Sequence, residues 1–263
     1  MKLLRCSKDQ THAGEEGPWG KIVAATVIGS AHERKNQLGQ DAYAIGIENE
    51  WLVAVVCDGA GSVPHGGDGA LLCAEGLANS LLCDLETVDP DQLSLETIDR
   101  FVTQRVEQIR KEIKGDLHEY AATLIGAVIS AKDTHLFHVG DGAAVAVPVL
   151  ENVPQWQEVI ISQPQNGEYI NETYFFTDPG WHDHLRMTAC GRVGRVALMT
   201  DGVTSFALSS TATVAERFMV PVFRHLQETE ADHGSRALYG TLRSAKARLV
   251  SDDDKTFVYI QCP

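Results

Sequence analysis

The chain has 263 residues, of which 44% are hydrophobic, and a net charge of −14. This length suits one large domain or two small ones, and the hydrophobic fraction is ordinary for a protein that buries a core. The acidic charge argues against nucleic-acid binding, which needs a basic surface, and against adsorption to anionic membranes. It would also repel phosphorylated substrates, unless bound metal cations reverse its sign locally.

The sequence shows no segment typical of export or membrane insertion. Its first ten residues, MKLLRCSKDQ, hold no apolar run long enough for a signal peptide, and no run approaches the roughly 20 apolar residues of a membrane helix. The six cysteines form no C-x-x-C pair, which is typical of reduced and mostly buried thiols. We therefore expect a cytoplasmic, monomeric protein that binds neither nucleic acid nor membrane.

The predicted elements alternate between groups of strands and pairs of helices. Residues 1–20 are interpreted as a loose arm, because much of this segment is polar and rich in glycine, and residues 21–263 as a single domain. In chain order we expect a strand (21–29), a hairpin (42–48 and 51–57) around Asn49-Glu50, a glycine-rich loop (58–69), two helices (69–83 and 93–114), three strands (121–130, 134–139 and 143–149), a strand (195–200), two helices (212–228 and 233–249) and a final strand (256–261). Between residues 150 and 193 only 173–178 suggests a strand.

This order of elements predicts the fold class. Strands grouped by hairpins favour antiparallel sheets over a βαβ winding. Two such sheets packed face to face, with a helix pair outside each, would bury the apolar faces of both pairs. We therefore predict an α+β fold, a four-layer α-β-β-α sandwich.

Three predicted strands end in the dipeptide Asp-Gly, at Asp58, Asp141 and Asp201, and an acidic group at 252–254 precedes the last strand. A single Asp-Gly is more often a hairpin turn than a ligand. Strands of one sandwich can, however, bring carboxylates at their ends into one cleft, where the carboxylates raise each other's pKa. A bound hard cation removes that cost, and all-oxygen sites suit Mg²⁺ or Mn²⁺.

Five short motifs follow one another along the chain: Gln40-Asp41-Ala42, Asp58-Gly59-Ala60-Gly61, Val139-Gly140-Asp141, Asp201-Gly202 and Asp253-Asp254-Lys255-Thr256. Each motif is weak alone, but an accidental match of all five in the right order is improbable. In this order they resemble the motifs of the metal-dependent, type 2C Ser/Thr protein phosphatases, in a divergent bacterial branch.

The resemblance implies a β-sandwich flanked by helices, with a centre of two Mn²⁺ or Mg²⁺ ions. Asp58 would bridge the ions, the Gly59 carbonyl would bind one of them, and Asp201 and Asp253 would bind the other. A water between the ions would attack the phosphorus of a phosphoserine or phosphothreonine in a protein substrate. No protein nucleophile is needed.

Two further aspartates follow from the same resemblance, and one residue departs from it. Asp41 would hold metal-bound water, and Asp141 would help to bind a weaker third ion. The usual glutamate ligand is Gln40 here, so we expect this metal site to bind its second ion more weakly than a site with a carboxylate.

Two other departures concern the substrate phosphate and the leaving group. A histidine that often follows the Asp-Gly is Ala60 here, and the expected arginine would fall at Asn36. Three neighbouring residues are predicted to bind the phosphate instead: His32, Arg34 and Lys35. His65, in the glycine-rich loop, is either a surface turn residue or a replacement proton donor.

Two other functions compete with an active phosphatase. The altered residues could mark a non-catalytic relative that binds a phosphoprotein or another partner. The run VVCDG, which ends at Gly59, superficially resembles an aspartyl-nucleophile phosphohydrolase, but that chemistry normally needs a D-x-D pair and residue 60 is alanine. The H-x-H pair at His182 and His184 is interpreted as an exposed loop, because no further ligands close a metal site around it.

Overall fold

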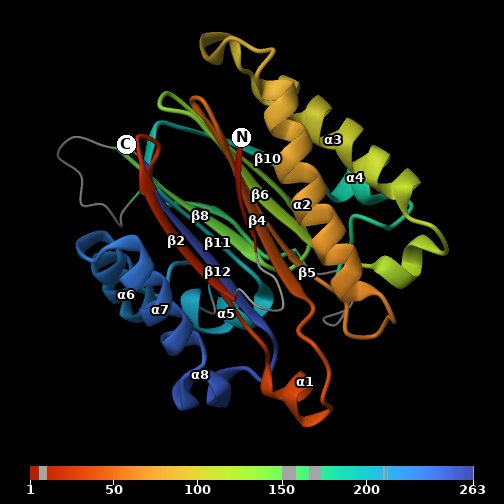
Figure 1. Cartoon of the computed structure of the whole chain (residues 1–263), viewed down its shortest axis with the longest axis vertical. Coiled ribbons are helices and arrows are strands. Elements are labelled where there is room, and N and C mark those ends of the chain that lie inside the picture. The colour runs from red at the N-terminus through yellow and green to blue at the C-terminus, as the bar shows by residue number, and fades with distance from the viewer. Residues whose placement is uncertain (6–10, 150–157, 166–172, 210, 212, 263) are drawn as a thin grey trace.

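The computed structural model describes residues 1–5, 11–149, 158–165, 173–209, 211 and 213–262. Two six-stranded antiparallel sheets form its centre (Figure 1). The first sheet has the order β1 (Lys2–Arg5), β4 (Asp41–Glu48), β5 (Trp51–Asp58), β6 (Leu124–Ile129), β7 (Thr134–Val139) and β10 (Arg186–Gly191). The second has the order β2 (His12–Gly17), β3 (Gly20–Val27), β12 (Lys255–Gln261), β11 (Val193–Met199), β8 (Ala143–Pro148) and β9 (Ile160–Ser162).

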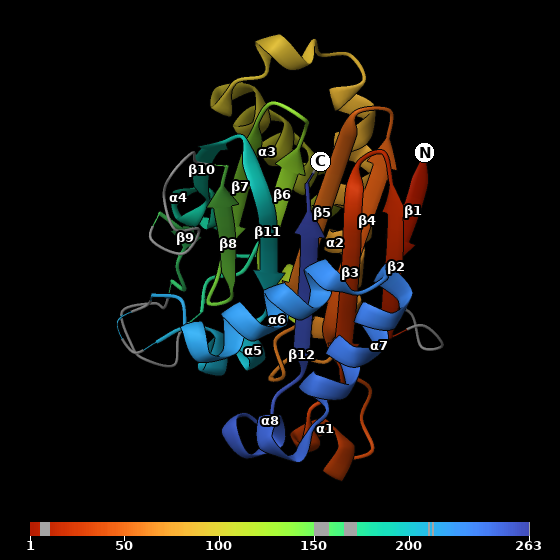
Figure 2. The ribbon, with the colours of Figure 1, turned by 90° about the vertical axis from the view of Figure 1, so that its left-hand side faces the viewer.

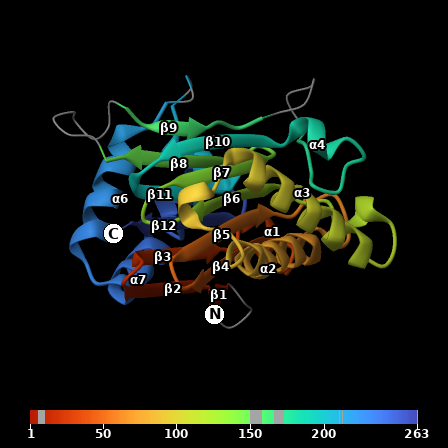
Figure 3. The same cartoon turned by 90° about the horizontal axis from the view of Figure 1, so that it is seen from above.

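Helices cover the outer faces and one end of the sandwich. They are α1 (Ser30–Arg34), α2 (Gly66–Leu85), α3 (Leu95–Glu112), α4 (Trp181–His184), α5 (Asp201–Ala207), α6 (Glu216–Glu228), α7 (Ala231–Leu242) and α8 (Ala245–Val250), with short 3-10 helices at Pro90–Gln92 and Leu117–Tyr120. Seen from above, α2 and α3 lie outside the first sheet, and α6 and α7 outside the second (Figure 3). The predicted α-β-β-α sandwich is therefore confirmed.

The apolar periodicity of the sequence accounts for this layering. In α3 the residues that recur at steps of three and four, Ile98, Val102, Val106 and Ile109, are the buried ones. In β5 nearly every residue is buried, since one face packs on α2 and the other on the second sheet. The hairpin predicted around Asn49 is also present, and Asn49 adopts a positive φ of 51°, which asparagine tolerates in tight turns.

The prediction of a loose arm over residues 1–20 is wrong for the residues that the structure describes. β1 pairs with β4 at the edge of the first sheet, and β2 pairs with β3 at the edge of the second. Both are edge strands, whose exposed side favours polar residues, so they lack an apolar pattern. Gly14 has a specific role, because a Cβ there would lie 2.0 Å from the Ala231 carbonyl oxygen at the start of α7.

The region 150–193, in which the sequence suggested only one strand, contains further secondary structure. Residues 150–157 and 166–172 of this region lie outside the described residues. Here β9 and β10 complete the two sheets. Residues 173–178 form no strand, and the H-x-H segment is the short helix α4 instead of a loop. The predicted helix 233–249 is two helices, because Ser244 caps the start of α8. Within the described residues we find no helix with the length and hydropathy of a membrane span.

The strand ends that carry the aspartates meet at one end of the sandwich. Asp41 opens β4 and faces Asp58, the last residue of β5, across the ladder. Figure 2 shows that β11 ends and β12 begins at the end that carries α1 and α8. Asp201 follows β11 and Asp253 precedes β12, so both sheets contribute carboxylates to this end.

Candidate metal centre

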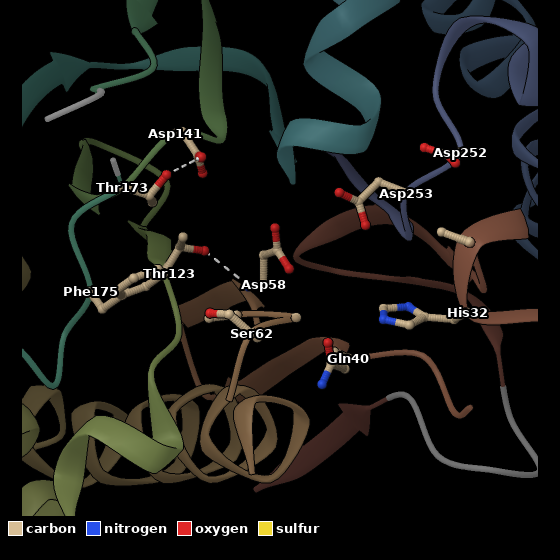
Figure 4. A pocket seen from close by; sticks show the side chains of 14 residues that line it. His32, Gln40, Asp58, Ser62, Thr123, Asp141, Thr173, Phe175, Asp252 and Asp253 are labelled. Carbon is tan, nitrogen blue, oxygen red and sulfur yellow. Dashed lines mark hydrogen bonds between the residues drawn. The ribbon is translucent and has the colours of Figure 1, made fainter. Parts of the chain in front are cut away.

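Three aspartates from separate strand ends converge in one cleft. One carboxylate oxygen from each of Asp58, Asp141 and Asp201 lies within 4.8 Å of the other two. The cleft has a volume of about 270 Å³, and Asp253 also lines it. Figure 4 shows Asp58, Asp141 and Asp253 directed into this shared space. The sequence-based expectation that the Asp-Gly strand ends come together therefore agrees with the structure.

Hydrogen bonds with neighbouring threonines hold the aspartates in place. The Thr123 hydroxyl accepts the backbone N–H of Asp58 at 2.9 Å, and the Thr173 hydroxyl donates to the Asp141 carboxylate (Figure 4). The Thr200 hydroxyl accepts the Thr256 N–H at 2.9 Å and donates to Asp41 at 2.8 Å. Because Thr200 belongs to the second sheet and Asp41 to the first, this contact ties the two sheets together beside the cleft.

Two glycines of the motifs are required by space or by backbone conformation. A Cβ on Gly59 would lie 2.3 Å from the Gly66 carbonyl carbon, so this glycine lets the start of α2 approach the cleft. Gly140, before Asp141, has a φ of +116°, a region that favours glycine. Gly59 lines the cleft, as expected for a residue whose carbonyl binds a metal ion.

The carboxylates are electrostatically unfavourable as an isolated group. Burial raises the pKa of Asp58 well above its usual range, and the charges of Asp41, Asp201 and other carboxylates add to this. Burial, followed by Asp141 and Asp253, raises the pKa of Asp201 to about 6. The pKa of Asp41 is raised by burial and then by a neighbouring carboxylate. A divalent cation among these groups offsets the repulsion and favours their charged forms.

The donor atoms also fit a hard cation. Four buried side-chain oxygens in or next to the aspartate group have no hydrogen-bond partner among the described residues: Gln40 Oε1, Asp41 Oδ1, Asp141 Oδ1 and Asp201 Oδ1. Buried oxygens without donors are costly, unless an ion or water satisfies them. A set made only of carboxylate and amide oxygens is the kind that Mg²⁺ and Mn²⁺ prefer.

The acidic residues at 252–254 have different environments in the structure. Asp254 is 2% exposed and accepts hydrogen bonds from the backbone N–H groups of Gly29 and Gln40, each at 2.6 Å. Its carboxylate is thus engaged in holding two loops together. Asp253 instead lines the cleft.

The structure separates the three residues predicted to bind phosphate. His32 lines the cleft. Arg34 does not: its guanidinium pairs with Asp252 at 2.8 Å, and its side chain is 65% exposed. Lys35 is also absent from the cleft lining. His32 and Arg34 lie in the short helix α1 and Lys35 directly follows it, so only part of this segment faces the cleft.

The cleft wall includes residues that the sequence analysis did not single out. They come from segments outside the named helices and strands: Ser62, Thr123, Thr173 and Phe175. The segment with Phe175 is held to α3, because Arg110 donates to the carbonyl oxygens of Phe176 and Asp178 at 2.6 and 3.0 Å. No motif signals such contacts between distant segments.

The positions of His65 and of the H-x-H pair in the structure bear on what was predicted for them. His65 is not among the cleft-lining residues; its Nδ1 lies 3.1 Å from Asp68, and its side chain is 43% exposed, which agrees with a surface turn residue. In α4, His184 stacks on Tyr174 and His182 contacts Trp181. Within the described part of the chain, the potential metal-binding cluster is the aspartate group, and neither α4 histidine belongs to it.

Comparison with known proteins identifies the family. The model of the family described as Protein phosphatase 2C matches residues 28–243. The chain belongs to the protein phosphatase 2C family. A curated relative of this phosphatase, serine/threonine-protein phosphatase 3 of Escherichia coli strain K12, is 28% identical over 253 residues, which cover 90% of this chain and 96% of the relative.

Solved structures share the phosphatase fold. The serine/threonine phosphatase Stp1 from Staphylococcus aureus has a TM-score of 0.62 at 15% identity, covering 95% of this chain and 97% of that one. The catalytic domain of PstP, in complex with two manganese ions, has a TM-score of 0.57 at 13% identity, covering 92% and 96%. These two likenesses support the four-layer architecture.

Proposed function

We propose that this protein phosphatase 2C uses two Mn²⁺ or Mg²⁺ ions, and a weaker third, to hydrolyse phosphoserine and phosphothreonine in proteins. The observation that carries the proposal is the convergence of Asp58, Asp141 and Asp201 within 4.8 Å, at a cleft that Asp58 and Asp141 line. We further infer that the chain acts as one catalytic domain, which includes the edge strands β1 and β2, in a cytoplasmic monomer. The acidic charge and the absence of C-x-x-C pairs support this inference.

Different residues at the proposed metal centre would bind the ions and orient the attacking water. Asp58, Asp201, Asp253 and the Gly59 carbonyl would hold the two ions, and Asp141 the third. When bound, such ions lower the pKa of a water molecule and neutralise charge on the phosphoryl oxygens. Asp41, fixed by the Thr200 hydroxyl, would orient that water through its free oxygen.

The alternatives have less support than phosphatase activity. A non-catalytic binding module has no need for several buried carboxylates whose pKa values are raised by burial and by one another. An aspartyl nucleophile would need a second acid two residues after Asp58, and Ala60 stands there. The family match also does not favour either alternative.

The substrate class is tested by comparing three phosphopeptides of one sequence, which carry phosphoserine, phosphothreonine or phosphotyrosine. With Mn²⁺ or Mg²⁺ present, we expect phosphate release from the first two and little from the third. Phosphate release is measured with the purified protein. Turnover of none of the peptides with either ion would contradict the proposal.

Gln40 is expected to set the strength of metal binding. Its Oε1 atom is buried without a partner, and Figure 4 shows the side chain beside the cleft. An amide oxygen offers a dipole where a carboxylate offers a full charge, so we expect activation at millimolar ion concentrations. Gln40→Glu should lower the half-activating Mn²⁺ concentration about tenfold, since ligand charge tunes affinity in oxygen sites.

A Mn²⁺ titration of phosphatase activity checks the Gln40 prediction. The matched control is Gln37→Glu, which adds the same charge at an exposed residue that does not line the cleft. An unchanged or higher half-activating concentration in Gln40→Glu would show that Gln40 is not at the metal. An equal shift in the control would mean that overall charge, and not a ligand, is responsible.

A further inference from the structure

His32 is held in a defined orientation at the wall of the cleft by a buried carboxylate. Its Nδ1 atom lies 3.0 Å from both oxygens of Asp254, and its side chain is 12% exposed. Each oxygen of Asp254 also accepts a backbone N–H, one from Gly29 and one from Gln40. The carboxylate is thus fixed before any substrate binds.

This pairing determines which ring nitrogen faces the substrate. A carboxylate that already accepts two N–H groups acts as an acceptor, so the hydrogen on Nδ1 of His32 points to Asp254. Nε2 is then left on the cleft side, where Figure 4 shows the ring. A Cβ placed on Gly61 would lie 4.0 Å from Nε2 and 3.5 Å from Gln40 Oε1, so both atoms border the same space above the glycine-rich loop.

We propose that His32 is a catalytic residue, the general acid that protonates the leaving seryl or threonyl oxygen, and that Asp254 is its positioning residue. The proposal rests on the proposed function. It assigns His32 a chemical step in place of simple phosphate binding.

The step balances as follows. The bond that forms joins the oxygen of the attacking water to phosphorus, and the proton that this water loses goes to solvent. The bond that breaks joins phosphorus to the side-chain oxygen of the substrate. The electron pair of the broken bond stays on that oxygen, which takes the proton from Nε2 of His32. The imidazolium becomes a neutral imidazole, and it regains a proton from solvent water before the next turnover.

The other ionisable side chains among the described residues that line the cleft are engaged elsewhere. Asp252 pairs with Arg34, and the remaining carboxylates form the metal cage. The Thr173 hydroxyl donates to Asp141. Residue 60 is alanine, so the glycine-rich loop supplies no imidazole next to Asp58. His32 is the one imidazole among the described lining residues.

The test compares a phosphoserine peptide with p-nitrophenyl phosphate, using the Mn²⁺-loaded protein. A nitrophenolate leaves without help, whereas a serine alkoxide needs a proton, so loss of a general acid affects the peptide selectively. We expect His32→Gln to lower kcat on the peptide about 100-fold or more, and kcat on p-nitrophenyl phosphate by less than about fivefold. Asp254→Asn should show the same selectivity, because it disturbs the orientation of the ring.

Controls separate this role from binding or folding. Calorimetric Mn²⁺ binding and thermal melting should be unchanged in His32→Gln, and His65→Gln, a histidine outside the cleft, should leave both rates unchanged. Equal losses on the two substrates would overturn the assignment of His32 and indicate phosphate positioning instead. A full peptide rate in His32→Gln would also overturn it. Absence of turnover in the unaltered protein would overturn the proposed function itself.

Discussion

Replacing Asp58 by asparagine is expected to lower phosphatase activity by more than about 100-fold, which exceeds the 10–100-fold cost of losing a partner outside the ligand set. Asp58 would bridge the ions, so its loss removes both ion positions and the water they activate. Asp201→Asn should behave alike, because it removes a ligand from the same cage. Turnover of p-nitrophenyl phosphate under saturating Mn²⁺ measures both effects.

Thermal melting of the metal-free proteins provides the control for Asp58→Asn. Burial and neighbouring carboxylates raise the pKa of Asp58, so its charged form destabilises the metal-free fold near neutral pH. The variant should therefore melt at the same temperature as the unaltered protein, or higher, while it remains inactive. Activity within about tenfold of the unaltered protein would contradict the cage assignment.

The raised pKa of Asp201 predicts the pH range in which the stability of the metal-free protein changes. Its pKa in the folded state is about 6, above the usual 3.8, so the folded metal-free protein binds more protons than the unfolded chain between these values. The stability that protonation supplies is present at low pH, and it is lost as pH rises from about 4 through about 6. In Asp201→Asn this part of the pH dependence should be absent.

Removal of divalent ions is expected to abolish activity altogether, and Mn²⁺ or Mg²⁺ should restore it. The proposed reaction uses a water activated by the metal ions, and the carboxylates repel an anionic phosphate until cations reverse the local charge. The measurement is turnover of a phosphoserine peptide after exhaustive chelation and dialysis, followed by titration with each ion.

The ions that restore activity show which kind of ligand atom forms the site. Hard ions that accept oxygen ligands should restore activity, whereas thiophilic ions should not. Melting curves before and after chelation show whether the loss comes from unfolding. Full activity in the chelated protein, or recovery with a thiophilic ion alone, would contradict an all-oxygen metal centre.

The main features of the site could be predicted because they follow from local patterns. An apolar strand that ends in Asp-Gly identifies its own end, and Asp58, Asp141 and Asp201 all meet in the structure. The amphipathic helix over 93–114 was equally clear, since its buried residues follow one helical face. Such patterns need no knowledge of distant neighbours.

What could not be predicted depends on contacts between distant segments. Asp254 lies 222 residues from His32 and looks like one of three equivalent acids in the sequence. The edge strands β1 and β2 have neither apolar alternation nor β-branched residues, which are the usual sequence signals of a strand. They form strands because they pair with β4 and β3. Loop residues at the cleft, such as Thr173, belong to no pattern at all.

The order of strands in the second sheet has a consequence for how the enzyme is made. β12, at residues 255–261, lies between β3 and β11. A nascent chain that has not yet reached β12 cannot close this sheet, and it lacks Asp253 and Asp254 as well. Pairing between such distant segments forms slowly, because the entropy cost of closing the loop arises before the stabilising contacts are made. Phosphatase activity should therefore appear only after synthesis is nearly complete, and chains truncated before β12 remain inert.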